Sequence, residues 1–572
     1  MMRGDSRLDL ARRAEAWRAL DGGFVDVLVV GGGVTGAGVA LDAATRGLST
    51  ALVEARDFAS GTSSRSSKLL HGGLRYLEQL DFRLVREALR ERDLMLTRLA
   101  PHLARPVSFL YPLTRHGWER IYVGAGLTLY DTMGGARSLP RHRHHTRTGA
   151  RALAPALRRD ALVGGVRYYD AQCDDARHTL TLVRTAAAYG AIVRSSTEVI
   201  GFIREGGRIV GADLRDTETG ERASVRSGVV VNATGVWTDD VQRLADTRGE
   251  FKVRASKGIH LVVPRDRISS ETGLILRTER SVLFVIPWGD HWIVGTTDDD
   301  WHYAKAHPAA SRTDIDYVLD HVNRVLAVPL TRDDISGVYA GLRPLLSGEH
   351  EETSQLSREH AISRTPRGMV SVAGGKYTTY RVMAKDAVDA AVADLGRHAP
   401  PCVTDRIPLL GADGYHALAN QSDSLAEELG LPRWRVDHLL GRYGALLREV
   451  VEPADADRRW LDPVPGAGGY LLAEIRYAAT HEGALHLDDV LARRTRVSIE
   501  TPHRGVESMK SVAGVLADVL GWDDEQLTRE VAAYDARVAA ERASQEQTDD
   551  ENAIARRLVA PDNRETLVDT KR

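Results

Sequence analysis

The sequence predicts an α/β fold that begins with a Rossmann-like dinucleotide-binding unit and ends in a helical part. Residues 24–30 form an apolar, β-branched run, and the glycine-rich sequence GGGVTG follows at residues 31–36. From residue 400 onward the pattern becomes that of amphipathic helices, for example at 484–495 and 509–520. The 572 residues exceed what one hydrophobic core usually organises, so we expect two or three structural units.

The bulk composition is that of an ordinary globular protein. A net charge of -3 gives no reason to expect nucleic acid as a partner. The two cysteines, Cys173 and Cys402, cannot form a disulfide framework and suit a reducing compartment, the cytoplasm. The longest apolar stretch, 24–44, carries five glycines and two aspartates, so it predicts a strand, a turn and a helix and not a membrane span. Residues 1–23 lack the apolar core of a secretory signal and predict a short amphipathic helix.

The opening segment carries the parts of a dinucleotide-binding fingerprint in register. Gly31, Gly33 and Gly36 fit G-x-G-x-x-G, in which glycines permit a tight turn and let the backbone approach a pyrophosphate. The N-terminus of the following helix, expected at 35–46, would meet the negative charge of that pyrophosphate. A second strand at 50–53 then delivers Glu54, at the spacing where an acid accepts hydrogen bonds from ribose hydroxyls.

Two later segments favour FAD over NAD as the dinucleotide. Residues 61–68 read GTSSRSSK, a loop of hydroxyl groups and small residues that suits a phosphate and a ribityl chain. Residues 229–235 read VVVNATG, a buried strand that runs into a small-residue turn, as in two-domain flavoproteins where such a strand returns beside the dinucleotide. From these segments we expect FAD contacts from Thr62, Ser63, Ser66, Ser67, Lys68, Ala233 and Gly235.

The run SSRSSKLLHGGLRYL at 63–77 closely resembles the membrane-associated, FAD-linked glycerol-3-phosphate dehydrogenases. Further resemblances cover roughly residues 24–390, with a looser match at 484–495. They follow in the order expected of the family: DDAR at 174–177, NATG at 232–235, KGIH at 257–260, IVGTTD at 293–298, GLRPL at 341–345 and GGKYTTYR at 374–381.

The resemblance implies a glutathione-reductase-type FAD domain, a mixed α+β substrate domain and a C-terminal helical domain. We expect the FAD-binding domain to comprise 24–105, 170–245 and 355–395, and the substrate domain 106–169 and 246–354. An N-terminal extension, 1–23, would precede them. The helical cap would span 396–545, and 546–572 would form a polar, partly disordered tail.

The same resemblance implies oxidation of sn-glycerol 3-phosphate to dihydroxyacetone phosphate, with a hydride passing to FAD N5 and electrons passing to a membrane quinone. A glycerol-3-phosphate oxidase that uses O₂ remains an alternative, because the motifs do not separate the two acceptors. Another FAD-dependent oxidase on the same scaffold is a further alternative. No EF-hand pattern is present, so we expect no calcium regulation and no metal.

The reaction needs cations for the phosphate, a base or alkoxide stabiliser for the hydroxyl, and positive charge near flavin N1. For the phosphate we expect Arg75, which the family places in the site, with Tyr76 and Arg358 in support. His71 is the natural base, because imidazole titrates near neutral pH and two glycines follow it.

Two further cations complete the expected catalytic group. Arg343 would stabilise the developing oxyanion, and Lys376 would lie near the pyrimidine edge of the flavin or the substrate oxygen. Gly375 and Thr378 would contact the cofactor, while the choice of base among His71, Arg343 and Lys376 stays open. Two more residues stay open: His260 faces either the substrate cavity or the sheet behind it, and the same choice stays open for Asp298.

Residues 132–159 contain no acid but seven arginines and three histidines. We expect this basic segment to be exposed, either as a solvated loop or as a patch that docks on anionic lipid with the apolar stretch 121–129 beside it. Docking would make the protein peripheral on the inner face of the cell membrane. Without an accompanying acid or cysteine the histidines predict no metal site, and without aromatic residues the segment predicts no RNA. The helical part would pack on the catalytic body or on another subunit, as in a homodimer.

Overall fold

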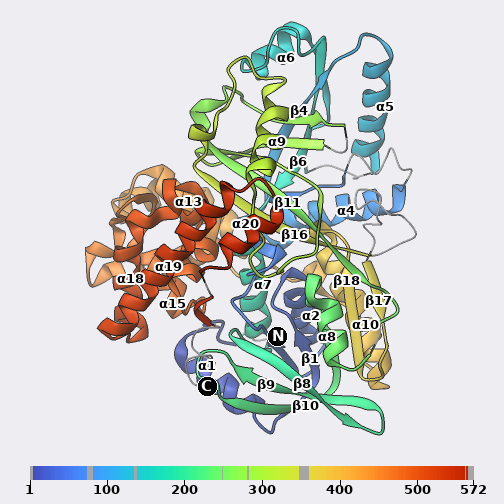
Figure 1. Cartoon of the computed structure of the whole chain (residues 1–572), viewed down its shortest axis with the longest axis vertical. Coiled ribbons are helices and arrows are strands. Elements are labelled where there is room, and N and C mark those ends of the chain that lie inside the picture. Colours follow the sequence, from blue (N-terminus) through green and yellow to red (C-terminus); the bar gives the residue numbers. More distant parts are fainter. Residues whose placement is uncertain are drawn as a thin grey trace.

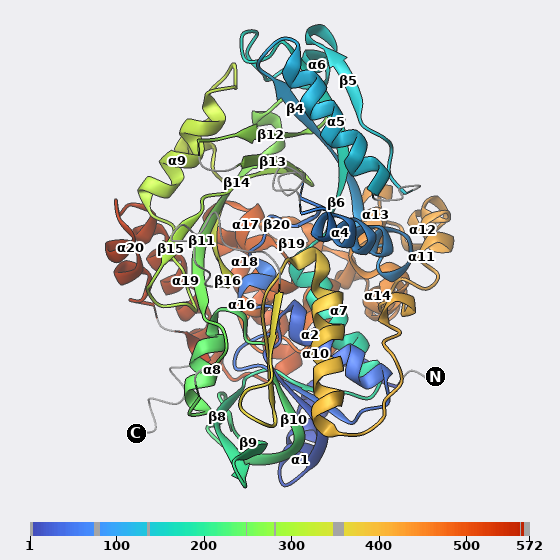
Figure 2. The same cartoon turned by 90° about the vertical axis from the view of Figure 1, so that its right-hand side faces the viewer.

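The computed structural model describes residues 4–73, 81–133, 138–247, 249–279, 282–346, 360–560 and 562–564. One β-sheet occupies the lower half of the view in Figure 1 and a second sheet the upper half. The C-terminal helices, orange to red, lie along one side of both sheets. Figure 2 shows the same arrangement from the side, with helices α2 and α10 in front of the lower sheet.

The first sheet has a parallel centre whose strand ends meet at one edge. Strand β1 pairs in parallel with β10 and β2, β10 with β18, and β2 with β7, whereas β17 is antiparallel to β18. The antiparallel strands β8 and β9 extend the sheet from β10. The bounds are β17 His360–Ser363, β18 Met369–Gly374, β10 Arg222–Asn232, β1 Phe24–Val30, β2 Thr50–Val53, β7 Ile192–Arg194, β8 Thr197–Glu205 and β9 Arg208–Asp216. Because Val30 pairs with both Asn232 and Val53, the turns after β1, β2 and β10 open at the same edge.

Both faces of this sheet are covered, which explains the continuous apolar run of β1. Val27 and Val29 share a core with helices α2 (Val34–Thr45), α7 (Asp175–Ala188) and α10 (Tyr380–Leu395). Leu28 and Val30, on the opposite face, pack with Leu20 of α1 (Leu10–Leu20) and with β9. The predicted strands at 24–30 and 50–53, the helix at 35–46 and the N-terminal helix are therefore confirmed.

The second sheet is mixed, as predicted. Its order is β15, β11, β14, β13, β12, β4, β6 and β3, with β16 against β11 and β5 against β6; β4 and β12 run parallel. Helices α9 (Arg312–Asn323) and α6 (Arg147–Leu153) cover one face. The bounds are β3 Leu69–Leu70, β4 Arg105–Leu113, β5 Arg143–Thr146, β6 Gly164–Gln172, β11 Val253–Pro264, β12 Gly273–Arg277, β13 Val282–Trp288, β14 His291–Gly295, β15 Asp299–Trp301 and β16 Gly337–Leu346.

Helices form most of the C-terminal part, as predicted, around cores of their own. A short hairpin of β19 (Pro463–Val464) and β20 (Ala467–Leu471) lies among them. The helices are α11 Tyr415–Ala419, α12 Ser422–Leu429, α13 Arg433–Tyr443, α14 Leu447–Val451, α15 Leu472–Thr480, α16 Leu487–Asp489, α17 Val497–Glu500, α18 Val506–Leu520, α19 Asp524–Gln545 and α20 Asp550–Arg557. Three helices elsewhere are α4 Phe82–Leu94, α5 Trp118–Met133 and α8 Thr238–Leu244. Within the described ranges, no helix is both long and apolar enough to span a membrane.

Two stretches of this part differ in detail from what the sequence indicates. The stretch 484–495 is helical over 487–494 and places Leu487, Val490 and Leu491 in an apolar core, but α16 gives way to a π-helix at Val490–Arg494 whose charged side chains are also buried and are paired with acids. The segment after residue 545, expected as a partly disordered polar tail, is ordered over 546–560 and 562–564, where α20 packs against α19. In both places charged side chains find partners that are distant in the sequence, so a polar composition does not mean an exposed or unfolded chain.

Candidate active site between the two sheets

A cavity of about 1000 Å³ lies between the two sheets. One end is formed by the turns after β1, β2 and β10, and the other by the turn after β18 and by strands β11, β12, β13 and β16. Ligand pockets measure roughly 300–1,000 Å³, so this one suits an elongated cofactor together with a small substrate. The predicted site residues that line it are Gly31, Gly33, Glu54, Thr62, Ser63, Ser66, Ser67, His71, Ala233, Gly235, Arg343, Gly375, Lys376 and Thr378.

The turn after β1 brings backbone close to the cavity. Gly31 has a φ of 110°, and a Cβ there would lie 2.7 Å from the carbonyl oxygen of Ala233. Gly33 caps helix α2 without a side-chain hydrogen bond, and the next N–H, that of Val34, donates to Ser63 Oγ at 2.9 Å. Glycine is therefore required where β1 meets β10, and the N-terminus of α2 faces the cavity as an anion site.

Glu54 stands at the end of β2, where the fingerprint predicts it. One of its carboxylate oxygens accepts the backbone N–H of Gly32 at 2.6 Å, and the other accepts that of Arg56 at 2.9 Å. Burial raises the pKa of Glu54, although these two N–H donors oppose the shift. The carboxylate is thus held in one orientation at the cavity wall, ready to accept from ribose hydroxyls.

Two predicted cofactor contacts do not line the cavity. A Cβ on Gly36 would lie 1.9 Å from the carbonyl oxygen of Gly31, so this glycine lets α2 pack against the turn. Lys68 is fully buried, and its ammonium binds Asp175 at 2.8 Å and the carbonyl oxygen of Ser64 at 3.2 Å. Its side chain therefore supports the loop 62–68 from behind, because a buried ammonium needs a carboxylate partner.

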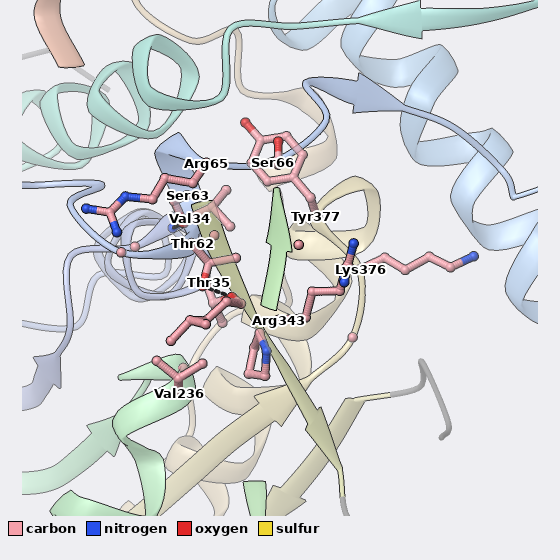
Figure 3. Close-up of a pocket in the computed structure, with 18 of the residues that line it drawn as sticks. Val34, Thr35, Thr62, Ser63, Arg65, Ser66, Val236, Arg343, Lys376 and Tyr377 are labelled. Carbon is pink, nitrogen blue, oxygen red and sulfur yellow. Dashed lines mark hydrogen bonds between the residues drawn. The ribbon is translucent and has the colours of Figure 1, made fainter. Parts of the chain in front are cut away.

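The loop 62–68 is fixed from several directions while its hydroxyls line the cavity. Thr62 Oγ1 donates to the carbonyl oxygen of Leu342 at 2.6 Å. Ser66 donates its N–H and its hydroxyl to one oxygen of Asp175, at 2.9 and 2.7 Å. Asp175 also binds Arg496 from the C-terminal part, so that part of the chain helps to hold the cofactor loop. Figure 3 shows Thr62, Ser63 and Ser66 beside the start of α2.

His71 is positioned through its own backbone. Its N–H donates to Thr378 Oγ1 at 3.2 Å, and its carbonyl oxygen accepts from the same hydroxyl at 3.3 Å. The next N–H, that of Gly72, donates to the hydroxyl of buried Tyr130 at 2.8 Å, and Tyr130 donates to Asp170 at 2.6 Å. Side chains from two distant segments thus fix the backbone that carries the imidazole.

Lys376 joins the same arrangement from the turn after β18. Its ammonium donates to the carbonyl oxygen of Gly72 at 3.2 Å. The turn requires glycine, because Gly375 has a φ of 77° and a Cβ there would lie 2.5 Å from Met383 Sδ. Lys376 and His71 therefore belong to two segments that are bonded to each other at the cavity wall.

Arg343 projects from β16 and is held by an acid. Its guanidinium binds Asp298 at 2.9 Å and donates to the carbonyl oxygen of Thr297 at 3.1 Å. Gly258 on the neighbouring strand makes room, since a Cβ there would lie 2.6 Å from Arg343 Nη2. Asp298, left open by the sequence, lines the cavity and orients this arginine.

The side chain of His260, for which the sequence left two orientations open, lines the cavity. Its Nε2 lies 2.8 Å from Ser67 Oγ, and its ring stacks on Tyr339 with centroids 4.8 Å apart. Burial, with the cations of Arg343 and Lys68 nearby, lowers the pKa of His260 well below its usual value. The imidazole is therefore neutral at physiological pH.

The three predicted phosphate ligands, Arg75, Tyr76 and Arg358, lie outside the described residues. Sequence reasoning missed several side chains that line the described cavity. Some of them sit in quoted motifs, for example Arg65, whose side chain extends to the opposite side from Lys376 in Figure 3, and Tyr377. The others that we note are Tyr111, Tyr168, Asp170, Arg277 and Phe284, which come from β4, β6, β12 and β13, strands without a recognisable motif.

Comparison with known proteins identifies the family. Residues 26–390 match the family described as FAD dependent oxidoreductase, and residues 402–527 match the C-terminal domain of alpha-glycerophosphate oxidase. Glycerol-3-phosphate dehydrogenase 2 of Mycobacterium tuberculosis is 60% identical over 98% of this chain and 96% of its own. The chain belongs to the FAD-dependent glycerol-3-phosphate dehydrogenase family.

Other members agree in sequence and in fold. Glycerol-3-phosphate dehydrogenase of Mycobacterium leprae is 59% identical over 99% of this chain and 96% of its own. The crystal structure of the glycerol-3-phosphate dehydrogenase from Bacillus halodurans complexed with FAD superposes with a TM-score of 0.76 at 29% identity, covering 93% of this chain and 98% of that one. The predicted family, fold class and FAD cofactor are confirmed.

The residues of the cavity fit FAD. The glycine turn and the N-terminus of α2 suit the pyrophosphate, and Glu54 suits the adenosine ribose. The loop 62–68 offers hydroxyls along the middle of the cavity, and Arg343, Lys376 and His71 lie at the far end. We infer that the isoalloxazine ring lies at this far end, because the polar groups without a dinucleotide role gather there.

Proposed function

We propose that the chain oxidises sn-glycerol 3-phosphate to dihydroxyacetone phosphate. The observation that carries the proposal is that His71, Arg343 and Lys376 line the same cavity as the dinucleotide fingerprint. The names of the relatives, glycerol-3-phosphate dehydrogenases, support this substrate. FAD, when bound, supplies the hydride acceptor.

The phosphate dianion of the substrate needs fixed cations. Arg75, Tyr76 and Arg358 remain our proposed ligands, outside the described residues. Arg277, at the end of β12, lines the described cavity and adds a guanidinium to its wall. An anion that enters this end therefore meets arginine side chains, and we expect glycerol, which lacks the phosphate, to bind poorly.

The C2 hydroxyl must lose its proton as the hydride leaves. We propose His71 as the base, because its backbone is fixed by Thr378 and its side chain lines the cavity. Arg343, oriented by Asp298, and Lys376 would stabilise the negative charge that develops on the oxygen. Burial and the nearby cations lower the pKa of His260, which makes it a weak proton acceptor, so we assign it substrate positioning.

We further propose a membrane quinone as the electron acceptor, with a peripheral position on the inner face of the cell membrane. The supporting feature is the outer face of α5, where Trp118, Ile121, Tyr122 and Leu129 are 58%, 74%, 49% and 40% exposed. These residues recur every three, four or seven positions and so form one apolar stripe on the helix. The opposite face, with Val123 and others, is buried against the second sheet.

The basic segment follows α5 in the chain and packs against it. Strand β5 belongs to this segment, and a Cβ on Gly124, on the buried face of α5, would lie 2.8 Å from the ring of His144, so the two elements touch. The arginines at 141, 143, 147, 158 and 159 are exposed, as predicted. Trp118, Ile121 and Tyr122 would enter the headgroup region while the arginines bind lipid phosphates, the arrangement of an interfacial helix.

A single experiment tests substrate and chemistry together. The purified flavoprotein should lose its flavin absorbance anaerobically with sn-glycerol 3-phosphate, without NAD, and should keep it with glycerol. A quinone analogue should reoxidise the bleached protein faster than air-saturated buffer does. Rapid reoxidation by O₂ with stoichiometric peroxide would instead establish the oxidase alternative, and bleaching by an amino acid would establish another oxidase.

Docking is tested with vesicles. Ile121→Glu should reduce binding to anionic vesicles about tenfold or more, because a charge replaces buried apolar area. Trp434→Glu, at a residue that is 55% exposed on α13, is the matched control and should bind as the parent does. Equal binding by both variants would remove α5 as the docking element.

The predicted domain boundaries and the homodimer remain proposals. Sedimentation analysis of the purified protein tests the homodimer.

A further inference from the structure

The C-terminal segment, residues 550–560 and 562–564, packs against the wall of the cofactor cavity. In Figure 1, α20 lies between α19 and strand β11, and in Figure 2 it lies at the outer left, beside β15. From the sequence alone this segment is expected to be only a polar tail. Its contacts fall on two regions of the cavity wall, one polar and one apolar.

The polar contacts reach the adenosine end. Asp562 binds Arg56 at 2.9 Å, and Arg56 is itself a lining residue two positions after Glu54. Arg564 Nε donates to Ser196 Oγ at 2.9 Å. The backbone N–H of Ser196 donates to the carbonyl oxygen of Arg56 at 2.7 Å, so both contacts converge on one small region.

That region is strained and needs support. Ser196 adopts a φ of 47°, a left-handed backbone that costs a residue other than glycine about 1–2 kcal/mol. The next residue, Thr197, lines the cavity, and its N–H donates to the carbonyl oxygen of Glu54 at 2.7 Å. Arg564 and Asp562 thus hold, from outside, the two strand ends that face the adenosine ribose.

Arg564 is anchored firmly enough to give this support. It is 7% exposed and binds Asp489 of the C-terminal part at 2.9 Å and Glu218 of the β9–β10 turn at 3.4 Å. Glu218 in turn binds His486 at 3.0 Å. The guanidinium therefore joins three parts of the chain at one buried point.

The apolar contacts reach the middle of the cavity. Ala553 and Ile554 of α20 are 0% and 5% exposed and belong to one core cluster with Val236 and Leu342. Val236 and Leu342 line the cavity on their other side. Helix α20 is consequently the outer layer of a wall whose inner layer faces the cofactor.

We propose that Asp562 and Arg564 are positioning residues for FAD and that the C-terminal segment retains the cofactor by fixing the adenosine end of its cavity. The residues act through Arg56, Ser196 and Glu54, not by touching the substrate. Without them, the strand ends after β2 and before β8 relax and the apoprotein must reorder them on binding. FAD affinity then falls, while the chemistry at the far end is unchanged once FAD is bound.

The test compares Arg564→Met, Arg564→Lys and Asp562→Asn with Arg542→Met, a control at an exposed arginine of α19. FAD dissociation constants are measured by titrating the apoprotein, and melting temperatures with and without excess FAD. We expect Arg564→Met to raise the FAD dissociation constant by about 10- to 100-fold, as removal of a hydrogen-bonded buried charge does. Arg564→Lys should keep part of the affinity, and the control should match the parent.

Flavin reduction at saturating FAD should proceed at the parent rate in every variant that binds FAD. The proposal is overturned if the dissociation constants stay within about twofold of the parent, a difference of less than 0.5 kcal/mol. It is also overturned if the melting temperature falls equally with and without FAD, because the segment would then serve overall stability alone. If Arg564→Met does not fold, Asp562→Asn and Arg564→Lys give the same comparison. FAD binding is read without substrate, so the result is independent of the proposed activity.

Discussion

Asp175 offers the sharpest test of how the cofactor loop is held. The carboxylate is fully buried and accepts from Ser66, from Lys68 at 2.8 Å and from Arg496. Asp175→Asn preserves the shape but removes the charge. Lys68, 0% exposed, then keeps a buried ammonium without its carboxylate.

The size of the effect follows from this burial. Removing one partner of a buried ion pair costs about 3–5 kcal/mol, since an uncompensated charge remains. Arg496 keeps its other partner, Asp174, so the lower figure applies. In the apoprotein the loop 62–68 can leave its position and so avoid this cost, whereas FAD binding requires the loop in place. At about 1.4 kcal/mol per tenfold change, 3 kcal/mol corresponds to about two powers of ten, so FAD should bind on the order of 100-fold more weakly.

The assay is titration of the apoprotein with FAD, followed by flavin fluorescence, for the parent, Asp175→Asn, Lys68→Met and the double variant. The double variant should bind more tightly than Asp175→Asn alone, because replacing both partners removes the stranded charge. Parent-like affinity in Asp175→Asn would refute the reasoning. So would a double variant whose loss equals the sum of the two single losses.

Three further predictions follow from the same geometry. His71→Ala should slow flavin reduction at saturating substrate by about 100-fold or more in stopped-flow experiments, as loss of a general base does, with FAD affinity unchanged; a parent-like rate would exclude His71 as the base. Gly36→Ala should abolish FAD binding, measured by flavin content after purification, because its Cβ would lie 1.9 Å from the carbonyl oxygen of Gly31; a yellow, stoichiometric variant would contradict this. Burial opposes the charged forms of Glu218 and His486, but their pairing lowers the pKa of Glu218 below its usual 4.5 and raises the pKa of His486 well above its usual 6.5. The ion pair therefore contributes its full stability between pH 4.5 and pH 6.5, the two usual pKa values. Its contribution is lost as the pH rises through the raised pKa of His486 or falls through the lowered pKa of Glu218. The difference in melting temperature between the parent and His486→Gln should be largest near pH 6, and a difference that does not change with pH would contradict the pairing.

The cofactor half of the site was predictable because its signals are local. Gly31, Gly33 and Glu54 lie within one strand–turn–helix–strand unit, and their spacing alone places them at one sheet edge. The loop 62–68 was predicted from its run of hydroxyl groups and small residues, and the turn at 374–378 from a resemblance whose motif is contiguous. Such local patterns can be recognised without knowing which residues pack against them in the folded chain.

The residues that sequence reasoning misassigned depend on partners far away in the chain. Lys68 was assigned to the cofactor, yet its charge is satisfied by Asp175, 107 positions later. The arginines of 484–495 indicated no particular partner either, and Arg494 pairs with Asp57 across 437 positions. No periodicity reports such pairs, because burial of charge is decided by tertiary contacts.

The C-terminal segment was missed for a related reason. Its composition is polar, and only Ala553 and Ile554 carry the apolar contact that docks α20. Two apolar side chains do not form a recognisable stripe. The role of Asp562 and Arg564 depends on their contacts with Arg56 and Ser196, which the sequence does not reveal. Composition describes what a segment is made of, whereas its partners decide whether it is ordered.

The most direct test is a crystal structure of the chain with FAD and dihydroxyacetone phosphate bound. The account predicts the adenosine ribose at Glu54 and the isoalloxazine at the opposite end of the cavity, with C2 of the ligand about 3–3.5 Å from flavin N5 and its oxygen facing His71, Arg343 and Lys376. A flavin ring bound at the Arg56 end, or a ligand carbonyl remote from all three side chains, would contradict it.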